Sequence, residues 1–142
     1  MDNTNNITKI SFDTGIREYE VNGNAILRFN PTDLNLYNRL LEILQEIPQM
    51  IDKNVKEHEG KTGPQLFRAL DIEAKKILSE AFGEGNDFDK IFGGVNIVAK
   101  RKAGGTVLEA FIEAILPIVK EGVEELLKEE DEAVEKYAGE YE

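Results

Sequence analysis

Hydrophobic and polar residues alternate along the first thirty positions, which is the period of a β-strand with one buried face. Ile10 and Phe12 alternate with polar neighbours, and so do the apolar residues of two further segments, IREYEV and AILRF. Asp-Thr-Gly at residues 13–15 precedes the second segment, and Asn-Gly at residues 22–23, the strongest short hairpin signal, precedes the third. The sequence therefore predicts a three-stranded antiparallel meander over residues 7–29.

After residue 30 the spacing of apolar positions changes to three and four, which is the period of an amphipathic helix. The Asn-Pro-Thr-Asp of residues 30–33 provides a helix start, and we expect a kink or break near Ile47 because Pro48 removes a backbone donor. The first helix should end near Glu57. Its expected buried stripe is Tyr37, Leu40, Leu41, Leu44, Ile47, Ile51 and Val55.

Two more long helical segments follow. The second is expected from Thr62 to a stop at Gly83, with a buried stripe of Phe67, Leu70, Ala74, Ile77, Leu78 and Ala81. Residues 87–92 can form one helical turn. A last helix, capped by Thr106, is apolar on most sides from Val107 to Val119, with an interruption expected at Pro117.

These elements predict a single α+β domain over residues 1–142, in which an N-terminal three-stranded antiparallel meander is followed by a bundle of three main helices. The meander spans residues 7–29 and the helical body residues 33–119. Residues 120–142 are expected to form an acidic C-terminal helix that is partly frayed, because its apolar positions are sparse.

The charge of the chain narrows its partners. The formal net charge is −11, and residues 120–142 hold ten acidic and three basic side chains, a net of −7. So negative a field repels nucleic acid, and we expect no nucleic-acid partner. No apolar run reaches the ~20 residues of a membrane span, the N-terminus lacks the plan of a signal peptide, and cysteine is absent. We therefore expect a cytoplasmic protein with no membrane partner and no thiolate metal site.

Three short motifs resemble catalytic or metal-binding patterns but lack essential parts. His58, the only histidine, has no neighbouring nucleophile. Gly-Lys-Thr at residues 60–62 resembles the end of a phosphate-binding loop, yet Val55 stands where that motif needs glycine. Asn-Asp-Phe-Asp at residues 86–89 begins like a calcium loop, but Ile91 occupies a ligand position. We therefore expect a non-enzymatic protein without cofactor or metal.

The stretch FGGVNIVAKRKAGG, residues 92–105, gathers the cations Lys100, Arg101 and Lys102 between two glycine pairs. Glycines before a helix can expose backbone donors to a phosphate, although no predicted strand leads into this segment. The favoured interpretation is a flexible connector. Its cations would either balance the acidic helices or face an acidic partner, including the acidic C-terminal segment of a neighbouring copy.

The order of these elements resembles a known family. The segments ISFDTG, EYEVNG and ILRFNPTD, followed by DKIFGGVN and FIEAILPIV, are similar to small proteins encoded among the tail genes of phages and prophages of Gram-positive bacteria. Some of these serve as tail assembly chaperones. The resemblance runs from about Ile10 to Val119. It implies a protein of the host bacterial cytoplasm that coats the long, helical tape-measure protein before the tail tube polymerises, and it transfers no catalytic residue.

The residues and the resemblance together favour a protein-binding protein with two contact surfaces. One is the apolar or edge side of the meander, and an exposed strand edge there could also join copies into a homo-oligomer. The other is the basic connector. The expected contact residues are Tyr19, Val21, Leu27, Phe29, Lys100, Arg101 and Lys102. Two alternatives stay open: a structural minor tail or connector protein of the particle, and an acidic decoy that mimics nucleic acid through residues 120–142.

Overall fold

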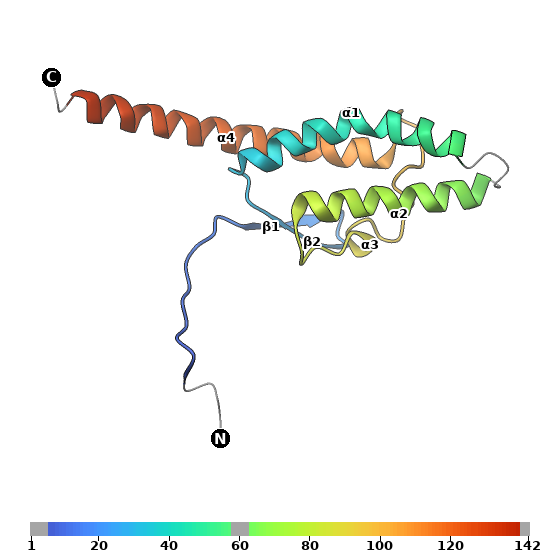
Figure 1. Cartoon of the computed structure of the whole chain (residues 1–142), viewed down its shortest axis with the longest axis horizontal. Helices are drawn as coiled ribbons and strands as arrows, with labels where there is room; N and C mark the ends of the chain where they lie inside the picture. The colour runs from blue at the N-terminus through green and yellow to red at the C-terminus, as the bar shows by residue number, and fades with distance from the viewer. Residues whose placement is uncertain (1–5, 58–62, 140–142) are drawn as a thin grey trace.

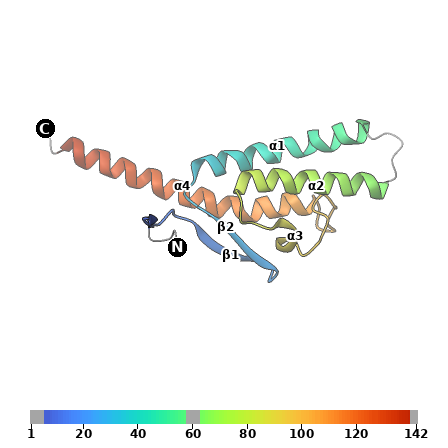
Figure 2. The same ribbon diagram turned by 60° about the horizontal axis from the view of Figure 1, so that its bottom comes forward.

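The computed structural model describes residues 6–57 and 63–139, with side chains up to residue 134. The elements are β1 (Arg17–Val21), β2 (Ala25–Phe29), α1 (Leu34–Glu57), α2 (Gly63–Phe82), α3 (Phe88–Ile91) and α4 (Val107–Gly139). The three long helices lie side by side, and β1, β2 and α3 lie on the side away from α1 (Figures 1 and 2). The distal half of α4 projects past the rest of the body. The result is a small, mostly helical α+β layout.

The predicted three-stranded meander is wrong, because the sheet has two strands. Asn30 Nδ2 donates to the carbonyl oxygen of Thr14 at 3.3 Å. A Cβ on Gly15, whose φ is +81°, would lie 2.8 Å from the same nitrogen. These contacts hold the segment before β1 next to Asn30, beyond the end of β2. The residues that precede Thr14 therefore do not fold back to pair with β1. Residues 6–16 instead form an N-terminal arm that leads away from the body (Figure 1).

The two strands form the hairpin that Asn-Gly predicts. Arg17 pairs with Phe29 and Val21 with Ala25, and the turn places Asn22 and Gly23 at φ of 50° and 72°. Positive φ at both residues is typical of type I′ hairpin turns, whose backbone twist matches the twist of the paired strands. Antiparallel pairing therefore continues without a break from one end of the hairpin to the other.

The two edges of the hairpin differ. The backbone N–H of Arg28 on β2 donates to Asn86 Oδ1 at 2.8 Å, and Asn86 Nδ2 donates back to the Arg28 carbonyl at 3.0 Å. One side-chain amide therefore pairs with both outward backbone groups of Arg28, whereas Ile26, the partner of Glu20 in the register, has none within the described residues. Glu18 is the partner of Arg28 in the register, so Glu18 and Glu20 direct their backbone groups outward from β1. Within the described residues nothing covers these groups, which leaves the edge of β1 open.

Helix α1 buries a different stripe from the predicted one. Leu41 and Val55 are exposed, and the buried residues are Leu36, Leu40, Ile43, Ile47, Met50 and Asn54. The stripe is thus rotated by about one residue. Asn54 is buried because its amide donates to the Met50 carbonyl and to Glu73 Oε2 on α2, a partner that the α1 sequence cannot show. The helix also continues through Pro48, which is exposed, so the expected break is absent.

The later helices agree with the sequence at their ends and differ in their interiors. Gly83, at φ +85°, follows α2, and Asp87 caps the single turn of α3. Thr106 Oγ1 accepts from Glu109 N at 3.1 Å and so caps α4. The expected interruption at Pro117 does not occur, because α4 is one helix of 33 residues. The helical part therefore consists of three long helices and the short α3.

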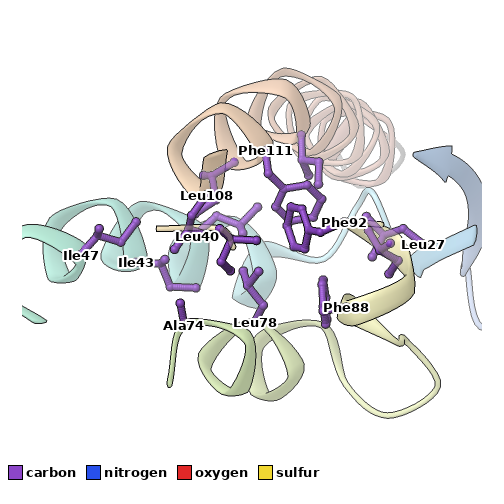
Figure 3. Packing of buried hydrophobic residues seen from close by; sticks show 14 of the residues in the cluster. Leu27, Leu40, Ile43, Ile47, Ala74, Leu78, Phe88, Phe92, Leu108 and Phe111 are labelled. Carbon is purple, nitrogen blue, oxygen red and sulfur yellow. The ribbon is translucent and has the colours of Figure 1, made fainter. Parts of the chain in front are cut away.

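An aromatic cluster joins the hairpin to the helices. The Tyr19 ring stacks on Phe29 at 4.4 Å between centroids, and Phe29 meets Phe82 of α2 edge to face at 5.8 Å. Phe111 of α4 then contacts Phe82, Phe88 and Phe92. Figure 3 shows Phe88, Phe92 and Phe111 converging beside the aliphatic residues of α1 and α2. All elements therefore share one core.

Gly122 is the point where α4 passes the start of α1. A Cβ at this position would lie 2.8 Å from the Pro31 carbonyl carbon and overlap its oxygen. Gly63, at the start of α2, has no such neighbour within 4 Å. Only glycine therefore fits this crossing without moving one of the two segments.

We expect Gly122→Ala to lower the free energy of unfolding by about 1–2 kcal/mol, because crowding outweighs the gain of about 1 kcal/mol in helix propensity. Urea denaturation measures the change. Gly63→Ala is the matched control and should alter the free energy of unfolding by less than about 0.5 kcal/mol. Equal effects of the two substitutions would contradict the crossing.

Candidate protein-binding surfaces

The structure separates the four hairpin residues that the sequence placed on one contact surface. Leu27 and Phe29 are 1% and 3% exposed and belong to the core, so neither is available to a partner. Tyr19 and Val21 are half-buried and pack against the edge of that core. Only these last two, on β1, reach a surface that another protein could contact.

Tyr19 and Val21 line a hollow of about 220 Å³ between β1 and α4, which we call the edge cleft. It lies directly beside the open edge of β1. Its other lining residues are Glu20, Asn22, Leu27, Phe29, Phe111, Ala114, Ile115 and Ile118. The sequence analysis missed Ala114 and Ile118, although the available signal was a helix apolar on more sides than burial requires.

The three cations of the connector are all exposed, and the segment makes several hydrogen bonds within the chain. Lys100 and Thr106 form an antiparallel bridge, and Arg101 N donates to the Gly105 carbonyl at 2.9 Å. The Arg101 guanidinium also donates to the Gly104 carbonyl at 2.8 Å. The connector is thus a hydrogen-bonded loop that presents its cations from a defined backbone.

A phosphate cradle at the start of α4 does not fit this geometry. Val107 N donates to the Ala99 carbonyl at 3.1 Å and Leu108 N to the Ile97 carbonyl at 2.8 Å. Glu109 N is taken by the Thr106 cap. The first backbone donors of the helix, which an anion would need, are therefore already bonded within the chain.

Lys100 instead borders a second, larger hollow of about 610 Å³, which we call the connector groove. The groove lies between α1, α2 and the connector, and is lined by Ile51, Phe67, Leu70, Asn96, Val98, Ala99, Lys100 and Thr106. Phe67 is 48% exposed, although its position in the helical pattern predicts burial. Lys100 is thus brought together with an apolar surface, and Arg101 lines a separate hollow of about 320 Å³ beside Val21 and Phe111.

A partly buried ion-pair network lies next to the α2 side of the connector groove. Lys75 Nζ lies 2.9 Å from Asp71 Oδ2 and 2.9 Å from Asp89 Oδ1, and Asp71 Oδ1 accepts from Ile97 N at 2.8 Å. Burial alone would lower the pKa of Lys75, but the hydrogen bonds to Asp71 and Asp89 outweigh it and raise this pKa. The network ties α2, α3 and the connector together and has a structural role.

The motifs that resembled catalytic or metal-binding patterns have structural explanations where they are described. Asn86 covers β2, Asp87 caps α3 and Asp89 bonds Lys75. Residues 58–62, with His58 and the Gly-Lys-Thr motif, lie outside the described part of the chain. In the described part, no three acidic or histidine side chains are placed to hold a metal ion, and no helix is long and apolar enough to cross a bilayer.

Comparisons with known proteins assign no family. No protein-family model, curated protein or solved structure matches the chain.

We expect Lys75→Met to lower the free energy of unfolding at pH 7 by about 1–2 kcal/mol, because it removes charge-assisted hydrogen bonds to the partly buried carboxylate of Asp71 and to Asp89. A raised folded-state pKa means that Lys75 stabilises the protein fully below its unfolded value of about 10.4, and that this contribution is lost as the pH rises through the higher folded value.

Urea denaturation at pH 7, 9 and 11 measures this dependence. The difference in the free energy of unfolding between Lys75→Met and the unaltered protein should therefore be constant from pH 7 to 9 and become smaller above pH 10. Lys76→Met, at the exposed neighbouring position, should change the free energy of unfolding by less than about 0.5 kcal/mol. A gap for Lys75→Met that does not vary with pH would show that its ion pairs are not the cause.

Proposed function

We propose that this chain is a non-enzymatic, cytoplasmic protein that binds apolar helical surface on an unassembled partner, as a phage tail assembly chaperone does for the tape-measure protein. The connector groove carries the proposal. It combines a large apolar lining with one bordering cation, Lys100, and a half-exposed aromatic side chain, Phe67. Grooves of this kind accept the apolar face of an amphipathic helix.

The lining of the groove favours a protein segment over a small polar ligand. A small-molecule site directs several polar groups at its ligand, whereas here the polar side chains are at the border and partly occupied. The amide of Asn96 donates to the Phe67 carbonyl at 3.0 Å, and Thr106 caps α4. Lys100 remains to pair with an acidic residue beside the apolar stripe of the bound helix. The preferred partner is thus an amphipathic helix with a carboxylate next to its apolar face.

The acidic half of α4 supports a coating role. Between residues 124 and 134 every described side chain except Leu126 is exposed, and most are acidic. This half projects from the body (Figure 1). A projecting negative helix adds repulsion between complexes and discourages contact with DNA. Weak binding by each copy is sufficient when many copies bind one long partner, because multivalent attachment gains avidity.

We expect Phe67→Ser to weaken binding to the partner by about tenfold or more, since a central aromatic anchor often contributes above 1.4 kcal/mol. The measurement is co-expression with a tape-measure protein, the proposed partner, followed by quantification of the soluble complex. Ile72→Ser on the same helix is the matched control, because Ile72 is also exposed but does not line the groove.

A helical partner that stays equally soluble without this chain would refute the chaperone proposal. Analysis of purified particles tests the alternative, because a chaperone leaves the assembled tail while a structural tail component remains in it. If Ile72→Ser reduced binding as much as Phe67→Ser, the connector groove would not be the contact site.

A further inference from the structure

The N-terminal arm exposes large apolar side chains that the rest of the chain does not cover. Ile10 is 83% exposed and Phe12 is 77% exposed, and Ile7 and Ile16 are also at the surface. Apolar residues gathered this densely on one short segment indicate a contact with another molecule. In an extended segment Ile10 and Phe12 lie on one face and Lys9 and Ser11 on the other.

The edge of β1 lacks a neighbouring strand and an apolar cover, and the arm has the extended backbone and apolar side chains that could provide both. The outward backbone groups of Glu18 and Glu20 have no partner within the described residues, and the apolar edge cleft lies on the inner face of the same strand. On the outer face, Glu18 pairs with Arg28 at 3.1 Å, whereas Glu20 has no cationic partner among the described side chains. An added strand should therefore be apolar on its inner face and carry a cation opposite Glu20.

The arm does not provide that strand to its own β1. The hydrogen bond from Asn30 to Thr14 and the close fit of Gly15 against Asn30 direct residues 6–13 beyond the end of the hairpin. Asp13 Oδ1 accepts from Gly15 N at 2.9 Å and from Arg17 Nη1 at 3.3 Å, which holds the same junction. A return along β1 would require these contacts to break.

We propose that residues 7–12 of one copy add an antiparallel strand to the edge of β1 in a second copy. Six extended residues span about 20 Å, enough to cover a five-residue strand of about 17 Å. Pairing Ile10 with Tyr19 places Ile10 beside the edge cleft, Phe12 on the same face opposite Arg17, and Lys9 opposite Glu20. A shift by one residue would place Ile10 opposite a glutamate, so the apolar pattern fixes the register to this face.

This contact uses none of the residues that line the connector groove, so it does not depend on the partner proposed above. The arm and the edge of β1 are different surfaces, so each copy carries one donor and one acceptor. Copies can therefore exchange arms in pairs or join head to tail. Both arrangements make the same strand addition, and the experiments below detect the strand itself.

Sedimentation equilibrium of the full chain over a range of concentrations should show reversible association. Ile10→Ser combined with Phe12→Ser should weaken this association roughly a hundredfold or more, because two buried apolar side chains are lost. These residues lie outside the folded body, so stability should not change. Ile7→Ser is the matched control, since Ile7 lies on the opposite face of the arm and should leave association within about twofold.

Complementation tests the direction of the contact. Glu20→Pro removes the outward N–H of β1 at an edge position where proline is tolerated, and it keeps the arm intact. This variant and the Ile10→Ser/Phe12→Ser variant should each be monomeric alone. A mixture of the two should form a one-to-one dimer, because one provides the edge and the other the arm.

The register is tested by exchanging charges. Lys9→Glu should weaken association by about two- to fivefold, since like charges on opposite strand positions repel. Lys9→Glu combined with Glu20→Lys should restore it. The proposal is overturned if the unaltered chain stays monomeric to millimolar concentration, if association survives loss of Ile10 and Phe12, or if the mixed variants fail to pair.

Discussion

A two-stranded hairpin has little stability of its own in water, so β1 and β2 depend on the aromatic contacts that attach them to the helices. Phe29 provides that attachment, because it stacks on Tyr19 within the hairpin and meets Phe82 on α2. Phe111 extends the cluster to α4 and α3. The strands are thus fixed from one face, and this arrangement leaves their edges to be covered by other means.

Asparagine side chains hold backbone groups at three points around the hairpin. Asn86 pairs with both backbone groups of Arg28, Asn24 donates to the Ile91 carbonyl at the end of α3, and Asn30 holds Thr14. Each amide satisfies backbone groups that would otherwise lack a partner. Along β1 the outward groups of Glu18 and Glu20 have no partner within the described residues, and this strand also borders an apolar cleft. The open edge and the cleft together make this the part of the hairpin suited to another chain.

The sequence predicted those features that depend on a few neighbouring residues. The Asn-Gly turn, the Thr106 cap and the Gly83 stop follow from local backbone chemistry, and all are present. The buried stripe of α1 could not be predicted from its own sequence, because apolar residues occupy two adjacent faces of the helix. The hydrogen bond from Asn54 to Glu73 on α2 favours burial of the face that carries Asn54. The prediction of a third strand was wrong for a similar reason, since the path of this segment depends on Asn30, about twenty residues later in the chain.

The candidate surfaces were predictable only in part for the same reason. Local pattern identified Tyr19, Val21 and Lys100, but the apolar residues beside them come from helices far along the chain. Phe67 fits the pattern of a core residue, yet it is 48% exposed and lines the groove. The edge cleft and the connector groove share no lining residue, so binding at one does not occlude the other. Copies joined through their arms would therefore keep their grooves free, and a row of linked grooves would bind a long helix more tightly than separate copies.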